Sequence, residues 1–139
     1  RAAAPGGRPY HCTLDLAARL TDQARRAGVM IAAGTDGFTP PESAWPALLE
    51  ELELLVDRAG MTPASAIRSA TAIGAMTIRQ QDRMGSIEAG KLANLLILAA
   101  DPLADISNLR TTLFTVKRGR RFDRSEYRPI GGEESAGDD

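Results

Sequence analysis

The chain has 139 residues and a formal net charge of −1, from 17 basic and 18 acidic side chains. Hydrophobic residues make up 43% and charged residues 25%, as in soluble globular domains, which excludes a wholly disordered chain. No run of about 18 uncharged apolar residues occurs, so we expect no membrane span. The single cysteine, Cys12, excludes an internal disulfide scaffold, and the balanced charge argues against a nucleic-acid binder.

The first half of the chain combines helical patterns with one strand-like run. Thr13 is a suitable N-cap for an amphipathic helix over residues 14–27, followed by a glycine stop. Residues 29–33 are uniformly apolar, which predicts a strand buried on both faces, as in the parallel sheets of α/β proteins. Further helices are expected over residues 44–59 and 62–78. This order predicts half of a βαβ unit followed by two helices.

Short β-like segments replace the helical pattern after residue 80. We expect a buried strand over residues 95–98 and a hairpin formed by residues 112–117 and 120–122. The acidic, glycine-bearing residues 125–139 predict a disordered tail. A helical α/β piece is thus followed by a small β piece.

Asp36 is the main candidate for chemistry. It follows the predicted strand inside a turn shaped by Gly34, Thr35 and Gly37, and ligand sites gather at the carboxyl ends of strands in α/β folds. A carboxylate there is able to bind a divalent metal or act as a general base. The alternative is ordinary turn chemistry, because Asp and Gly are common in turns.

Other polar residues carry weaker signals. His11, the only histidine, and its neighbour Cys12 lack the spacing of a zinc ligand set, so we interpret them as a helix-entry residue and a small packed residue. The basic run over residues 117–121 is interpreted as a solvated hairpin, because charge runs alone seldom specify a partner. The glutamates of residues 50–53 are expected on the solvent-exposed face of an amphipathic helix.

Several motifs in order resemble one known family. They are GVMIAAGTD at residues 28–36, ELELLV and AGMTP at 51–63, MGSIEAGKLANLLIL at 84–98, and VKRGR at 116–120. Together they resemble the C-terminal part of the amidohydrolase superfamily, in particular its imidazolonepropionase-like and prolidase-like metal-dependent hydrolases. The resemblance implies an α/β fold in which residues 1–82 form the last strand and helices of a (β/α)8 barrel. Residues 83–124 would then form part of a small β-sandwich.

A complete barrel of this kind needs about 250 residues, so we expect this chain to be a C-terminal fragment of a longer enzyme. The resemblance implies hydrolysis of C–N bonds with one or two divalent ions, zinc by preference. It assigns Asp36 as both metal ligand and catalytic acid–base. The family's upstream histidines and lysine have no counterpart here, and Asn94 stands where the family usually has Asp. We therefore expect weak metal affinity and no catalysis from this chain alone.

The partners follow from the same resemblance. We expect a small-molecule or short-peptide substrate, no nucleic acid and no membrane, and we leave oligomerisation open. A cytoplasmic location is expected, because no signal peptide or membrane segment occurs in the sequence. The alternative function is a non-catalytic interaction domain derived from an amidohydrolase.

Overall fold

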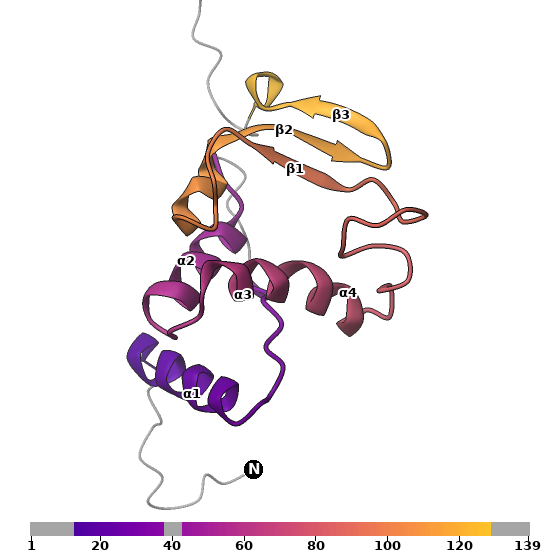
Figure 1. The fold of residues 1–139 in the computed structure, drawn as a ribbon. Helices are drawn as coiled ribbons and strands as arrows, with labels where there is room; N and C mark the ends of the chain where they lie inside the picture. The colour runs from indigo at the N-terminus through magenta and orange to yellow at the C-terminus, as the bar shows by residue number, and fades with distance from the viewer. Residues whose placement is uncertain (1–12, 38–42, 129–139) are drawn as a thin grey trace, which may run out of the picture.

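The computed structural model describes residues 13–37 and 43–128. Three layers are visible in Figure 1: helix α1 (Leu14–Arg26) at one end, the helices α2 to α4 in the middle, and a three-stranded sheet at the other end. Within the described ranges, no helix is long and apolar enough to cross a membrane. The predicted combination of a helical part with a small β part is confirmed, whereas a barrel sheet is not seen among these residues.

Helix α1 begins and ends where its caps predict. The Thr13 hydroxyl accepts a hydrogen bond from the Leu16 amide at 3.2 Å. At the other end, the Val29 amide donates to the Ala24 carbonyl at 3.0 Å across Gly28, which closes the last turn. None of the helix residues is buried, and Leu14 and Leu20 remain 50% and 54% exposed. Leu16, Ala17 and Ala24 are half-buried, so the apolar side of α1 is only partly covered by the described residues.

The strand predicted over residues 29–33 is absent, and the prediction of burial is wrong. These residues run from α1 toward the middle layer without helix or strand structure, and Val29 and Met30 are 57% and 66% exposed (Figure 1). The physical reason is that a strand needs a neighbour for its N–H and C=O groups. The strands of the described residues all lie after residue 94 and pair with one another.

Helix α2 (Ala47–Asp57) supplies the centre of the core. Its Leu49 and Leu52 are buried against Ala66, and against Ile106 and Leu109 of the 3-10 helix η2 (Ile106–Thr111). The helix is shorter than the predicted range of 44–59, because Pro46 is its N-cap and the chain leaves the helix at Arg58. One hydrophobic cluster therefore joins the helical part to the small β part.

The helix predicted over residues 62–78 is present with an irregular centre. It consists of α3 (Pro63–Arg68), the π-helical turn η1 (Ser69–Ile73) and α4 (Gly74–Thr77). The Thr62 hydroxyl accepts from the Ser65 amide at 3.2 Å, as its N-cap prediction requires. π-helical turns often occur at functional sites, and this one begins at the fully buried Ser69.

The sheet is antiparallel in the order β1-β2-β3, with strands Leu95–Leu98, Thr112–Lys117 and Arg120–Asp123. The predicted hairpin is confirmed. Positive φ angles of 52° at Arg118 and 81° at Gly119 give the turn the form that tight hairpins favour. The β1 strand is only half-buried, contrary to prediction, because one face of the sheet is uncovered and Leu96 is 43% exposed.

The chain after the sheet returns to the start of α2. The 3-10 turn η3 (Arg124–Glu126) follows β3, and the Arg124 guanidinium lies over the rings of Trp45 and Tyr127, 4.3 Å and 4.5 Å from their centroids. The Tyr127 hydroxyl donates to the Ser43 carbonyl at 3.1 Å. Residues 125–128, predicted as part of a disordered tail, thus make defined contacts, and residues 129–139 lie outside the described residues.

Candidate functional site

Asp36 occupies an exposed turn at the end of the irregular segment that follows α1. Its φ of 45° is in the left-handed region, where Asp is one of the few tolerated non-glycine residues. Gly34, Thr35 and Gly37 are exposed beside it, so the structure brings the four predicted residues together in one turn. No hydrogen bond or ion pair joins the Asp36 carboxylate to another described residue, and it faces solvent.

Two hydrogen bonds donated by backbone amides attach this segment to the helical layer. The Ala33 amide donates to the Ser69 carbonyl at 3.3 Å, at the start of the π-helical turn. The Gly34 amide donates to Oε1 of Glu51 on α2 at 2.8 Å. The chain is therefore fixed at two consecutive residues immediately before Thr35 and Asp36.

The prediction for the glutamates of α2 is partly wrong. Glu50 is exposed as expected, but Glu51 and Glu53 are half-buried and have specific partners. The Oε2 atom of Glu51 is buried without a hydrogen-bond partner in the described part of the chain. A sequence signal for Glu51 exists: the residues three and four positions away, namely Ala47, Leu48, Leu54 and Leu55, are all apolar. Helical spacing therefore places Glu51 among half-buried apolar side chains, on a different face of α2 from the buried Leu49.

Glu53 makes a bidentate ion pair with Arg110 on η2, with Nε to Oε1 at 2.7 Å and Nη2 to Oε2 at 2.9 Å. These hydrogen bonds hold the pKa of Glu53 below its ordinary value and raise the pKa of Arg110. The pair crosses the boundary between the helical part and the small β part, so its role is structural.

The described residues alone do not fit a divalent metal ion. Over residues 13–37 and 43–128, no three His, Cys, Asp or Glu side chains come close enough to share an ion. Asp36 offers one carboxylate, whereas a protein zinc site usually needs three or four ligands. The weaker candidates His11 and Cys12 lie outside the described residues.

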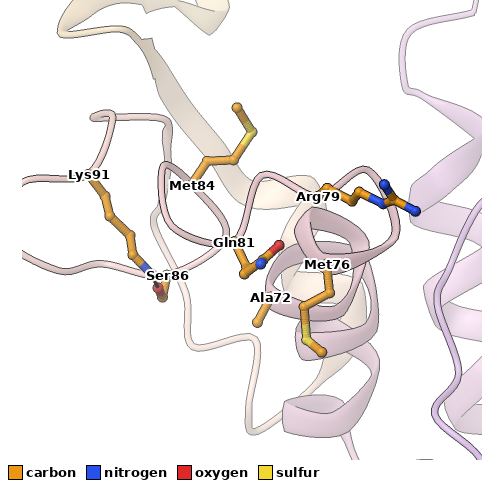
Figure 2. A pocket seen from close by; sticks show the side chains of 7 residues that line it. All are labelled: Ala72, Met76, Arg79, Gln81, Met84, Ser86 and Lys91. Carbon is orange, nitrogen blue, oxygen red and sulfur yellow. Dashed lines mark hydrogen bonds between the residues drawn. The ribbon is translucent and has the colours of Figure 1, made fainter.

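Two hollows lie in the described surface away from Asp36. One, of about 280 Å³, is lined by residues between Ala72 and Lys91 (Figure 2). In this hollow the Lys91 ammonium donates to the Ser86 hydroxyl at 2.6 Å, while the Arg79 side chain points away from the other labelled residues (Figure 2). A larger apolar groove, of about 650 Å³, lies between the start of α2 and the open face of the sheet and includes Trp45, Leu96 and Phe122.

The basic run of the hairpin is exposed throughout residues 117–121, and one of its arginines has an acidic partner. The Arg121 guanidinium pairs with Asp123 at 2.5 Å and lies 3.9 Å from the centroid of the Phe114 ring. Arg120 lies over Phe122 at 5.0 Å. The Arg121 guanidinium also lowers the pKa of the Asp123 carboxyl. These contacts agree with the interpretation as a solvated hairpin.

Comparisons with known proteins give one consistent result. Residues 16–122 match the model of the amidohydrolase family. Ochratoxinase of Aspergillus niger is 42% identical over 82 residues, which are 58% of this chain and 16% of that protein. Imidazolonepropionase of Pyrobaculum arsenaticum is 43% identical over 77 residues, which are 55% of this chain and 18% of that protein.

A solved structure agrees with these sequence matches. The crystal structure of a Xaa-Pro dipeptidase with bound methionine has a TM-score of 0.68 and 34% identity, covering 76% of this chain and 25% of that chain. The chain thus spans 16% and 18% of the length of the two curated relatives and a quarter of the solved neighbour.

Proposed function

This chain belongs to the amidohydrolase family, and from that premise we propose that it contributes Asp36 to the site of a metal-dependent hydrolase of C–N bonds. The membership confirms the resemblance indicated by the motifs between residues 28 and 120. The activity is proposed for a protein that combines this chain with the remaining barrel strands, because the chain covers only 16% to 18% of its curated relatives.

One observation carries the proposal: the exposed Asp36 carboxylate ends a segment that is held at two consecutive residues. The Ala33 and Gly34 amides bind the Ser69 carbonyl and the Glu51 carboxylate, at 3.3 Å and 2.8 Å. Catalytic groups must be held in a fixed geometry, and a rigid attachment of this kind suits a reacting side chain better than a free surface turn does.

The proposed role of Asp36 is proton transfer. One carboxylate oxygen accepts a proton from the attacking water as the new C–O bond forms. The same oxygen then delivers that proton to the leaving nitrogen as the C–N bond breaks, so the carboxylate is regenerated. Gly34, Thr35 and Gly37 shape the turn that directs the carboxylate. The substrate class is a small molecule or short peptide with an amide or cyclic amide bond.

We propose a divalent ion, zinc, as the cofactor of the complete site, with Asp36 as one ligand. A divalent ion supplies Lewis-acid polarisation of the substrate carbonyl. The other ligands must come from outside the described residues, because no set of three is present among them.

The domain assignment is proposed on the same basis. Residues 1–82 belong to the end of a (β/α)8 barrel, and residues 83–124 belong to a small β-sandwich. The positions of the elements support this division, since α1 to α4 end at Thr77 and the three strands begin at Leu95.

The test is a chimera in which the full chain replaces the segment of Aspergillus niger ochratoxinase that it matches. We expect hydrolysis of that enzyme's own substrate, with kcat reduced about a hundredfold or more by Asp36→Asn. Asp57→Asn is the matched control, because Asp57 is exposed at the end of α2. Metal content, measured by mass spectrometry, should also fall in the Asp36→Asn chimera only.

Two outcomes would overturn the proposal. The first is an Asp36→Asn chimera as active and as metal-rich as its parent, which favours the non-catalytic interaction domain. The second is zinc-stimulated amide hydrolysis by this chain alone, since a single carboxylate should bind zinc weakly. If the ochratoxinase chimera does not fold, as judged by circular dichroism, the same substitution is tested in the imidazolonepropionase background.

A further inference from the structure

Glu51 is half-buried on α2 and binds the segment that leads to Asp36. Its Oε1 atom accepts the Gly34 amide at 2.8 Å, and its Oε2 atom is buried without a partner among residues 13–37 and 43–128. Burying a carboxylate oxygen is costly unless hydrogen bonds compensate, and the hydrogen-bond partner of Glu51 among the described residues is this one backbone amide. Its position therefore calls for an explanation beyond the amphipathic pattern of the helix.

We infer that Glu51 is a positioning residue, whose carboxylate fixes the backbone at Gly34 and thereby sets where Asp36 presents its carboxylate. This inference rests on the proposed function for its catalytic consequence, but not for its structural part. Glu51 binds the backbone two residues before Asp36 and acts through that attachment, not on the substrate.

The second attachment explains why one hydrogen bond is enough to direct the turn. The neighbouring Ala33 amide binds the Ser69 carbonyl at 3.3 Å, and Ser69 is fully buried at the start of the π-helical turn. With Ala33 held by one helix and Gly34 by another, both the position and the direction of the chain entering the turn are fixed. Without the Glu51 carboxylate, only the hydrogen bond from Ala33 to Ser69 would hold the chain at the entry to the turn, and the direction of the turn would no longer be fixed.

The neighbouring glutamates do not share this role. Glu50 is exposed, and both oxygens of Glu53 bind Arg110. Glu50 is therefore a matched control, with the same side chain one position away on the same helix.

The structural part is tested by NMR on the full chain. We compare Glu51→Ala, Glu51→Gln and Glu50→Ala through amide exchange at Gly34 and 15N order parameters at Thr35 and Asp36. In Glu51→Ala, Gly34 exchange should accelerate about tenfold or more, because a hydrogen bond to a charged acceptor is lost. The order parameters should fall from about 0.85 toward 0.6. Glu51→Gln retains an acceptor oxygen and should restore both, and Glu50→Ala should change neither.

The catalytic part is tested in the chimera with ochratoxinase. Glu51→Ala should lower kcat about tenfold to a hundredfold with little change in KM, since a displaced catalytic group reacts more slowly. Glu51→Gln should recover most of this loss. Unchanged order parameters at Thr35 and Asp36 in Glu51→Ala would overturn the inference, whatever the activity. Altered order parameters together with an Asp36→Asn chimera of full activity would overturn the proposed function instead.

Discussion

Arg110 and Glu53 form a bidentate ion pair between helices α2 and η2, with both N–O distances below 3.0 Å. It lies beside the hydrophobic cluster that contains Leu49, Leu52, Ile106 and Leu109. At this point a polar contact and an apolar contact between the helical part and the small β part lie side by side, and each can be tested separately.

The ion pair should contribute about 1 kcal/mol to the free energy of unfolding, as partly exposed bidentate pairs do. A double-mutant cycle with Glu53→Ala and Arg110→Ala, measured by urea unfolding at pH 7, gives this coupling. The same cycle with Glu50→Ala in place of Glu53→Ala is the control and should give a smaller value, because Glu50 acts on Arg110 through its charge and makes no hydrogen bond to it.

The coupling should also depend on pH with a defined sign. Arg110 lowers the pKa of Glu53 from its ordinary value of 4.5, so the folded state holds the proton less tightly than the unfolded state. The contribution is therefore fully present above pH 4.5 and disappears as the pH falls through the lowered pKa. A coupling that grows on acidification would contradict this assignment.

Gly85 should tolerate no side chain. Its φ is 96°, and an added Cβ would lie 2.6 Å from the Cβ of Ala75 and 2.9 Å from the Thr71 carbonyl oxygen. Gly85→Ala should reduce the free energy of unfolding by about 3 kcal/mol, combining overpacking with backbone strain. Gly90 has a similar φ of 89° with open space around it, so Gly90→Ala should cost only about 1 kcal/mol. Equal losses for the two variants would rule out the packing contribution.

Asn94 should be replaceable by Asp. Its side-chain oxygen accepts the Arg118 amide at 2.9 Å, next to the turn of the hairpin. A carboxylate accepts the same hydrogen bond, so Asn94→Asp should leave the melting temperature unchanged at pH 7, whereas Asn94→Ala should cost about 1 kcal/mol. A loss of stability in Asn94→Asp equal to that in Asn94→Ala would refute the role of the acceptor oxygen.

Hydrogen exchange should divide the segment before Asp36 into two parts. Ala33 and Gly34 have acceptors for their amides, and we expect measurable protection there. Met30 and Ile31 lie in the irregular part, with Met30 66% exposed, and should exchange close to the unprotected rate. Core-like protection at Met30 would mean that a strand partner is present in solution.

Short sequence motifs correctly predicted the helices and the turn whose ends are stabilised by residues within the same motif. The Thr13 and Thr62 caps mark the starts of their helices, and Arg118-Gly119 marks the hairpin turn. The apolar run at 29–33 predicted a buried strand, but hydrophobicity does not supply the neighbouring strand that pairing requires. Whether such an apolar segment forms a strand therefore depends on its tertiary neighbours.

In the candidate site, too, one feature could be predicted from the local sequence and another depends on tertiary packing. Grouping Asp36 with its turn residues needed only the sequence, since the four are consecutive. The attachment to Glu51 joins residues 17 positions apart, so it depends on how α2 packs. The apolar neighbours of Glu51 at helical spacing indicate burial, but they do not identify the amide that it binds.

The irregular segment after α1 has a further consequence for the lifetime of the chain. Proteases bind their substrates as extended backbone, and exposed stretches without internal hydrogen bonds are their preferred targets. A cut beside Met30 or Ala32 would separate α1, none of whose residues is buried, from the cluster around Leu52. The rest of the described chain would keep its core, so limited digestion should convert the protein into a shorter stable product rather than destroy it.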